Sequence, residues 1–196
     1  MEPKKDLRIV KTEKNIKASF IQLINEKSFD SLTVQDILDR ALINRSTFYK
    51  HYTDKYNLAE TIAQNFIVEY RALVNFVIIK REIFGDLLNV DEKDNVLEKL
   101  YASKLTILGL WKIHTDEIHV YDDMHTILKQ RYLELTTSDA KQNADVEYES
   151  YICASILLST LKFVLEGHRI YSAHEIMEGL GNLLNTLGVS KHTVHN

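Results

Sequence analysis

Eight residues that begin at Arg45 carry side chains suited to contacts with nucleic acid. They read Arg-Ser-Thr-Phe-Tyr-Lys-His-Tyr, and every side chain except that of the phenylalanine has a hydrogen-bonding group. A helical step of about 100° per residue places Ser46 and Lys50 opposite Phe48. Arg45 can pair with a guanine edge, and Tyr49 can reach a phosphate. If the segment is helical, its exposed face is almost entirely hydrogen-bonding.

A helix with a clear N-terminal signal precedes this segment. Thr33 heads the sequence Thr-Val-Gln-Asp, in which the threonine caps the helix and Asp36 lies near the positive end of the helix dipole. The apolar residues recur at helical spacing and give one buried stripe: Val34, Ile37, Leu38 and Ala41. We therefore predict a helix of about two turns that ends near Ala41.

The three-residue step Leu42-Ile43-Asn44 separates this helix from the polar segment. Asn44 is a good N-cap for a second short helix, in which only Phe48 and Tyr52 need to face inward. Two short helices joined by a tight turn describe a helix-turn-helix, whose polar second helix fits the major groove of DNA. A solvated helical hairpin with ordinary surface charges is the alternative that this pattern leaves open.

A longer helix is predicted before the hairpin, from about residue 12 to residue 27. Thr12 can cap its N-terminus, and its apolar positions are Ile16, Phe20, Leu23 and Ile24. The charged tract 4–11 lies before this helix. That tract is either an arm that touches DNA or a frayed, solvated end.

The composition predicts an all-α protein with an uneven charge. Pro3 is the only proline and the chain has six glycines, so little in it would break a helix. The net charge is −4, yet residues 1–58 hold eleven Lys and Arg against eight Asp and Glu. This head is therefore +3 and the remainder −7. The acidic total thus gives no argument against a nucleic-acid partner for the head.

Several other classes of protein are disfavoured by the sequence. The single cysteine, Cys153, can form no internal disulfide and no thiolate cluster, which favours a reducing compartment and a cytoplasmic location. His114, His119 and His125 are spaced by five and six residues, which does not align metal ligands on one helical face. No P-loop, nucleophile elbow or dinucleotide glycine loop occurs, so we expect no enzyme, no cofactor and no metal. We also expect no membrane span and no signal peptide.

Residues 31–58 resemble the DNA-binding domain of the tetracycline-repressor (TetR/AcrR) family of bacterial transcription regulators. The resemblance rests on Thr-Val-x-x-Ile at the second helix, on Thr-Phe-Tyr followed by an aromatic three residues later, and on a lysine near the start of the fourth helix. Here these features are Thr33-Val34 with Ile37, Thr47-Phe48-Tyr49 with Tyr52, and Lys55. The match covers roughly residues 8 to 58. The family often has glycine where Ser28 and Leu42 stand, so the turns are where this chain departs from it.

The resemblance implies a role in DNA binding for nine residues of the head. Thr33 would bind a phosphate at the N-terminus of its helix, and Gln35 would lie where the family touches a base. Tyr49 and Lys55 would grip the DNA backbone. The residues implied to face the groove are Arg45, Ser46, Thr47, Lys50 and His51.

The rest of the chain reads as a helical body. A long stripe from Leu58 to Val77 would carry the head onto it. Gly85 and the acidic stretch 89–95 would interrupt the chain. Further helices are predicted near 96–113, 117–136, 145–167 and, after a Ser-Ala-His-Glu capping box, 172–188. We thus expect an all-α chain with a helix-turn-helix DNA-binding head at 1–58, joined by a long helix to an effector-binding and dimerisation body at 59–196.

The last two helices are more apolar than burial on one side requires, and Gly179 and Gly181 would allow close approach of backbones. A homodimer that addresses a palindromic operator on double-stranded DNA is the expected assembly, with a thick monomeric core as the alternative. The resemblance also implies a pocket for an unidentified small-molecule effector inside the body. Aromatic residues that suit such a pocket, without assignment as ligand contacts, are Phe66, Tyr70, Tyr101, Trp111, His114, Tyr132 and His168.

Two functions follow from these expectations. The first is a regulator, acting as a repressor, whose DNA affinity responds to an effector through two states of the protein. The second is a DNA-binding adaptor whose body recruits a protein through the acidic residues 91–94 and exposed tyrosines, and binds no metabolite. A sizeable apolar cavity would favour the first function, and a shallow exposed patch the second.

Overall fold

The structure, a computed structural model, describes residues 7–79, 90–136, 145–167 and 169–186. Every regular element in these ranges is a helix, as the sequence predicted. The helices are α1 (Leu7–Glu26), α2 (Val34–Ala41), α3 (Arg45–Tyr49), α4 (Lys55–Ile79), α6 (Val90–Ala102), α7 (Lys104–Leu110), α8 (Val120–Thr136), α9 (Asp145–Glu166) and α10 (Ala173–Thr186).

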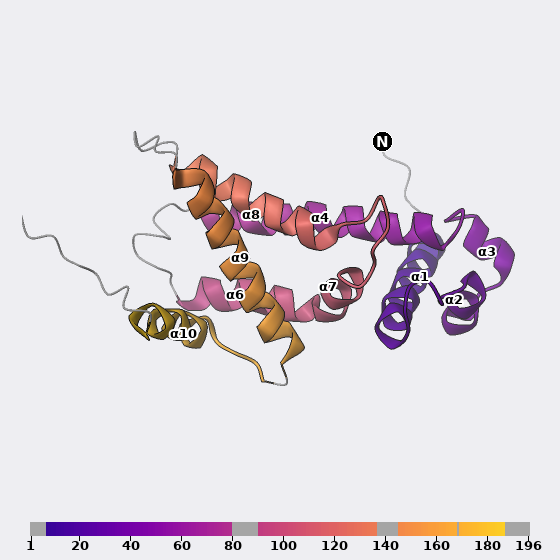
Figure 1. The fold of residues 1–196 in the computed structure, drawn as a ribbon. Helices are drawn as coiled ribbons and strands as arrows, with labels where there is room; N and C mark the ends of the chain where they lie inside the picture. The colour runs from indigo at the N-terminus through magenta and orange to yellow at the C-terminus, as the bar shows by residue number, and fades with distance from the viewer. Residues whose placement is uncertain (1–6, 80–89, 137–144, 168, 187–196) are drawn as a thin grey trace, which may run out of the picture.

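The helices form a small head at one end of an elongated molecule and a larger body at the other (Figure 1). The head consists of α1, α2 and α3, and α4 runs from it along the body. In the body, α8 packs against both α4 and α9, and α10 packs against α6. The predicted boundary at residue 58 falls inside α4, so the division into domains stays a prediction.

One hydrophobic core extends from the head into the body. Phe20 and Phe48 are fully buried at its head end, and Ile107, Met124 and Leu158 are fully buried in the body. The two ends meet where α7 packs against α1. The head is therefore held to the body by this second contact as well as by the continuous helix α4.

The first helix begins earlier than the sequence predicted. Thr12 does not cap it, because α1 already begins at Leu7 and the Thr12 hydroxyl donates to the Arg8 carbonyl at 2.9 Å. A threonine that bonds back to the preceding turn can lie inside a helix. Of the tract 4–11, residues 7–11 are thus helical, and residues 4–6 lie outside the described part of the chain.

Two predictions about the middle of the chain also need correction. Most of the acidic stretch 89–95 is helical and does not interrupt the chain, because α6 begins at Val90. The predicted helix 96–113 is divided at Ser103, whose φ of −92° and ψ of 6° lie outside the helical region. The break allows α7 to turn toward α1, a tertiary contact that no local pattern encodes. Residue 85 and the predicted end at 188 lie outside the described residues.

Candidate nucleic-acid interface

The turn between α2 and α3 has left-handed backbone geometry. Leu42 has φ 53° and ψ 46°, and its N–H donates to the Leu38 carbonyl, which also accepts the Ile43 N–H at 3.1 Å. Glycine adopts this conformation freely, whereas a residue with a Cβ is strained there by about 1–2 kcal/mol. The Leu42 side chain is 91% exposed, so its own packing does not offset this strain. The position where the family often has glycine is therefore the position that adopts the geometry glycine favours.

Helix α3 begins at the predicted cap and buries the predicted side chains. The Asn44 side-chain oxygen accepts the Thr47 N–H at 2.8 Å. Phe48 is fully buried and Tyr52 is 5% exposed, as the sequence predicted. The helix is shorter than predicted, because it ends at Tyr49 and His51 and Tyr52 lie in the following turn.

The exposed side of α3 presents four of the predicted DNA-binding residues to solvent. Arg45, Ser46, Tyr49 and Lys50 are all exposed, and the Arg45 guanidinium lies over the Tyr49 ring at 5.9 Å from its centroid. The hydroxyls of Ser46 and Thr47 both donate to the Asn44 side-chain oxygen at 2.8 Å. Arg45 and Lys50 make no hydrogen bond with another described residue, so their donors are available to a ligand. The DNA contacts themselves stay predictions.

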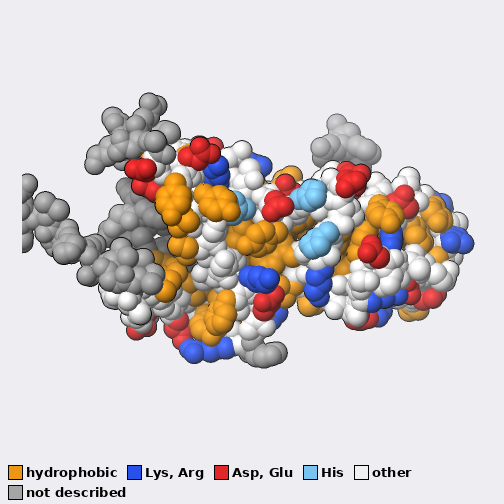
Figure 2. Space-filling model, viewed as in Figure 1, with side chains coloured by type: hydrophobic (Ala, Val, Ile, Leu, Met, Phe, Trp, Pro, Cys, Tyr) orange, Lys and Arg blue, Asp and Glu red, His pale blue; other side chains and the backbone are white. Residues whose placement is uncertain are grey.

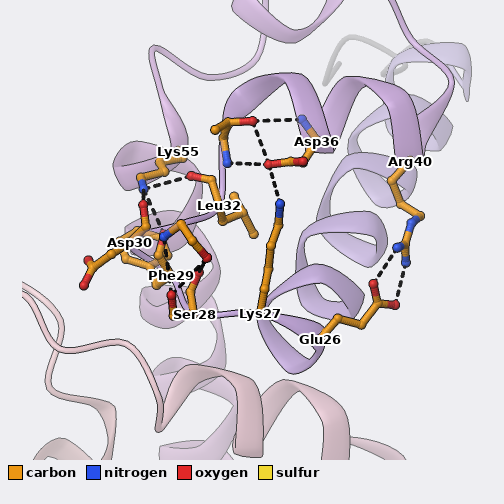
Figure 3. Close-up of polar contacts among 11 residues, drawn as sticks. Glu26, Lys27, Ser28, Phe29, Asp30, Leu32, Asp36, Arg40 and Lys55 are labelled. Carbon is orange, nitrogen blue, oxygen red and sulfur yellow. Dashed lines mark hydrogen bonds and ion pairs between the residues drawn. The ribbon is translucent and has the colours of Figure 1, made fainter.

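The N-terminus of α2 already holds a carboxylate from its own chain. The Asp36 carboxylate accepts the Thr33 N–H at 2.7 Å and the Thr33 hydroxyl at 2.6 Å, and the Lys27 ammonium lies 2.6 Å from it (Figure 3). Hydrogen bonds from Lys27 and then Thr33 lower the pKa of Asp36 to about 2. The donors of Thr33 are therefore occupied, and a phosphate that contacts Thr33 would compete with Asp36. The Gln35 amide is also engaged, because it donates to Asp39 at 2.8 Å.

Lys55 lies at the start of α4 and points back into the head (Figure 3). Its ammonium donates to the carbonyls of Phe29, Asp30 and Leu32 at 2.8, 3.1 and 2.9 Å. It also lies over the Phe29 and Tyr56 rings, 4.8 and 5.1 Å from their centroids. Because an ammonium has three N–H donors, these carbonyls engage all of them. A phosphate contact of Lys55 stays a prediction, and it would have to displace one of the carbonyls.

Ion pairs between α1 and α2 were not found by reading the sequence. Arg40 in α2 donates to both oxygens of Glu26 in α1 at 2.8 and 2.6 Å, and the pair is labelled in Figure 3. The hydrogen bond from Arg40 lowers the pKa of the Glu26 carboxyl. Together with Lys27–Asp36 this pair links the end of α1 to α2. The partners lie 14 and 9 residues apart in the chain, a separation at which sequence spacing carries no signal.

Comparison with known proteins agrees with this geometry. Residues 20–62, which span the end of α1 through the first turns of α4, match the family model described as bacterial regulatory proteins, tetR family. The head of the chain is a TetR-type DNA-binding domain. The matched residues include all nine predicted DNA-binding positions, which lie between Thr33 and Lys55.

Similarity to a known protein extends beyond the head. An uncharacterised HTH-type transcriptional regulator of Bacillus subtilis, YxbF, is 27% identical over 158 residues, which are 80% of this chain and 41% of that protein. The chain thus spans about two fifths of the length of this curated relative.

Solved structures share the fold over nearly the whole chain. A TetR-family transcriptional regulator from Syntrophomonas wolfei superposes with a TM-score of 0.64 at 15% identity, covering 94% of this chain and 98% of that one. A γ-butyrolactone receptor described as ArpA-like superposes with a TM-score of 0.54 at 16% identity, covering 94% and 100%. The fold of the body, and not only of the head, is therefore that of these proteins.

The matched family model is one of regulatory proteins and not of enzymes. Within the described residues, no group of three or more His, Cys, Asp or Glu side chains could hold a metal ion. His114, His119 and His125 accordingly form no such group with one another. The His125 ring instead contacts Ser155 at 3.1 Å and packs on the Tyr151 ring.

Proposed function

We propose that this chain is a sequence-specific DNA-binding transcriptional repressor of the TetR family that acts as a homodimer and responds to a small-molecule effector. The observation that supports it most strongly is the exposed face of α3, where Arg45 and Lys50 hold unengaged donors above the buried Phe48. A cytoplasmic location fits a protein that binds DNA. In this proposal the nine head residues named from the sequence contact the operator, with Arg45 as the principal reader of bases.

An unpartnered apolar stripe on α9 supports the homodimer. Tyr148, Ile152, Ile156 and Phe163 follow one face of the helix and are 69%, 37%, 39% and 64% exposed. Figure 2 shows hydrophobic side chains gathered along the course of α9. A stripe of this kind, alongside a buried opposite face, is typical of a helix that packs against a second molecule.

Helix α10 continues this apolar surface. Met177 and Leu183 are 40% and 49% exposed. A Cβ added at Gly179 or Gly181 would meet no atom of this chain within 4 Å. No described residue of the same chain therefore packs closely against these two glycines. A helix of a second chain could approach them closely. A twofold pair of chains would present two α3 helices to the two halves of a palindrome.

The same apolar character makes α9 the only described helix long and hydrophobic enough to cross a membrane. One third of its apolar window is buried inside this chain. Partial burial with an exposed stripe also suits a helix shared between the core and a dimer interface. We propose the dimer, because the buried residues of α9 contribute to the core of the body, with Leu158 and Leu165 fully buried.

An apolar cavity in the body supports the effector. The cavity has a volume of about 270 Å³ and lies among side chains of α4, α6, α8, α9 and α10. This is the feature that distinguishes a ligand-responsive regulator from an adaptor without a metabolite. The similar γ-butyrolactone receptor is named for a small molecule that it receives. The adaptor hypothesis relied on the acidic residues 91–94, whose side chains lie outside the described part of the structure.

DNA recognition by α3 can be tested with one substitution and its matched control. We expect Arg45→Ala to weaken binding to the DNA upstream of the protein's own gene by about 1–3 kcal/mol, because a bidentate contact to a guanine is lost. Binding to a scrambled duplex should change less. Fluorescence anisotropy at two salt concentrations measures both affinities. Arg71→Ala, which removes an exposed arginine from α4 outside the head, should leave both unchanged.

Equal losses on the two duplexes would remove Arg45 from base recognition. If neither duplex is preferred by the unmodified dimer, DNA from elsewhere in the genome has to be selected from a random pool. Failure of that selection would overturn the regulator function.

The dimer is tested by charging the stripe. The double substitution Phe163→Glu with Ile156→Glu should give a monomer, because two carboxylates would be buried without partners in the proposed interface. Light scattering after gel filtration measures the mass. Val68→Glu is the control, since Val68 is equally exposed, at 68%, but lies on α4. If the double variant and Val68→Glu are both dimeric, the interface lies elsewhere on the molecule.

A further inference from the structure

The lining of the body cavity is apolar almost throughout. Fifteen of the described residues line the cavity, and thirteen of these are Leu, Val, Ile or Met. Leu158 and Val164 of α9 and Val74 of α4 are at most 6% exposed, so much of the wall is interior. None of these described lining residues is charged. Such a wall offers no partner for an ionised carboxylate, phosphate or ammonium, and burial of an unpaired charge is strongly unfavourable.

Tyr70 and Thr160 supply the hydroxyls in this wall. Tyr70 is 6% exposed, and its ring stacks on Phe66 with centroids 6.1 Å apart. Its hydroxyl makes no hydrogen bond with another described residue. Burial raises the pKa of the Tyr70 phenol, so the hydroxyl keeps its proton at neutral pH and can donate. A hydroxyl in this wall without a partner among the described residues is available to donate a hydrogen bond to a ligand or a water.

A second hollow adjoins the cavity and shares Tyr70, Leu73 and Leu100 with it. This hollow has a volume of about 540 Å³, and its rim carries Glu69 and Lys99. The two spaces together form an apolar cavity with a more polar opening between α4 and α6. Tyr70 lies where they meet.

The volume limits the size of the ligand. An apolar cavity of about 150 Å³ holds benzene, so by the same scale a cavity of 270 Å³ holds about ten to twelve heavy atoms. A longer molecule would extend from the cavity toward Glu69 and Lys99.

We propose that the body cavity binds a small, uncharged, mainly aliphatic molecule whose one hydrogen-bond acceptor, such as a carbonyl oxygen, is held by the Tyr70 hydroxyl. This inference rests on the proposed function, in which the cavity is the effector site, and it specifies the chemical class of that effector. The aliphatic part fills the space between Leu100, Leu158 and Leu161, and the acceptor lies at the junction with the second hollow. An anionic group held inside this cavity would find no partner charge among the described lining residues, so an uncharged ligand is favoured.

The experiment uses two probes that match in number of heavy atoms and differ in charge. They are 2-decanone, which is an uncharged ketone, and nonanoate, which is an ionised carboxylate at neutral pH. Binding of each to the full chain is measured by isothermal titration calorimetry in the absence of DNA. We expect 2-decanone to bind at least tenfold more tightly than nonanoate.

Two tyrosine variants test the hydrogen bond. Tyr70→Phe removes one oxygen and keeps the stacked ring, so it should weaken 2-decanone binding by about three- to tenfold, which corresponds to the loss of one neutral hydrogen bond. Tyr121→Phe is the control, because Tyr121 is an exposed tyrosine of α8 outside the cavity, and it should leave the affinity unchanged. Circular dichroism checks that both variants keep the helical content of the parent.

The outcomes separate this inference from the proposed function. Equal or tighter binding of nonanoate, no effect of Tyr70→Phe, or no binding of 2-decanone up to its solubility would each overturn the ligand class. The DNA affinity is then measured with and without 2-decanone. If the ketone binds through Tyr70 but leaves the DNA affinity unchanged, the ligand class stands and the effector part of the proposed function fails.

Discussion

Replacement of Lys55 by methionine should lower the free energy of unfolding by about 2–4 kcal/mol. The ammonium donates to three carbonyls of the loop 29–32, and charge-assisted hydrogen bonds each contribute about 1.5–3 kcal/mol, with incomplete additivity. Methionine keeps most of the aliphatic stem, so the loss reports on the ammonium and not on packing. Urea unfolding followed by circular dichroism measures the change.

The matched control is Lys50→Met, which makes the same chemical change in the same head. Lys50 is exposed and makes no hydrogen bond with another described residue, so its replacement should change stability by less than about 0.5 kcal/mol. It should instead reduce the salt dependence of DNA binding by up to about one unit of slope, because one cation close to the DNA is lost. If the two variants have the same free energy of unfolding, the hydrogen bonds from Lys55 to the three carbonyls contribute no measurable stability. If Lys55→Met also lowers the slope, Lys55 reaches a phosphate as well.

Lys55 illustrates which parts of the interface the sequence could predict. Its position near the start of the fourth helix follows from local pattern and family resemblance. Its three carbonyl partners come from a loop 23 to 26 residues earlier, and no spacing rule connects a lysine to carbonyls at that distance. Sequence reasoning therefore placed the residue correctly and left out its contacts within the head.

The caps of α2 and α3 were predicted because their signals are local. Thr33 and Asp36 satisfy each other's backbone donors three residues apart, and Asn44 does the same for Thr47. Burial of Phe48 was predictable for the same reason, since it follows from the direction of side chains around one short helix. The start of α1 was not predictable in this way. Residues 7–10 are exposed, so they contribute to no apolar stripe that would extend the helix.

In the body, fewer features could be predicted, because more of them depend on tertiary contacts. The capping box at Ser172 and Glu175 is present, with the Ser172 N–H donating to Glu175 at 2.9 Å, so the start of α10 was predicted correctly. The break at Ser103 was missed because it depends on where α7 packs, and not on a helix-breaking residue. Among the aromatic residues considered for a pocket, Tyr101 and Trp111 instead bond within the fold, to the Tyr171 N–H and the Met124 sulfur. Composition could not distinguish these two residues from Tyr70, which lines the cavity.

Substitution of valine for Gly109 should cost about 2–3 kcal/mol, because Gly109 lies at the contact between α7 and α1. A Cβ at this position would lie 2.5 Å from Cδ1 and 2.8 Å from Cγ1 of Ile24, and 2.9 Å from Nδ2 of Asn25. Ile24 is 1% exposed and has no free space to move into. The Asn25 amide is held by the carbonyls of Ile21 and Leu105 at 2.8 and 2.9 Å. Extra methyl groups in such a packed contact typically destabilise by about 1–3 kcal/mol, and valine adds three carbons. Urea unfolding again measures the loss.

A compensating substitution tests whether the clash with Ile24 is the cause. Ile24→Ala removes three carbons, so by itself it should cost about 2–5 kcal/mol through the cavity it leaves. In the double variant the added and removed carbons balance, and the combined loss should fall at least about 1 kcal/mol short of the sum of the two single losses. Additive losses would show that valine at 109 disturbs something other than Ile24. Because this contact joins α1 of the head to α7 of the body, the double variant should recover part of the lost stability while changing the fit between head and body. Its DNA affinity should therefore respond less to a ligand in the cavity than that of the unmodified protein, since an effector acts on the head only through contacts that differ between two states.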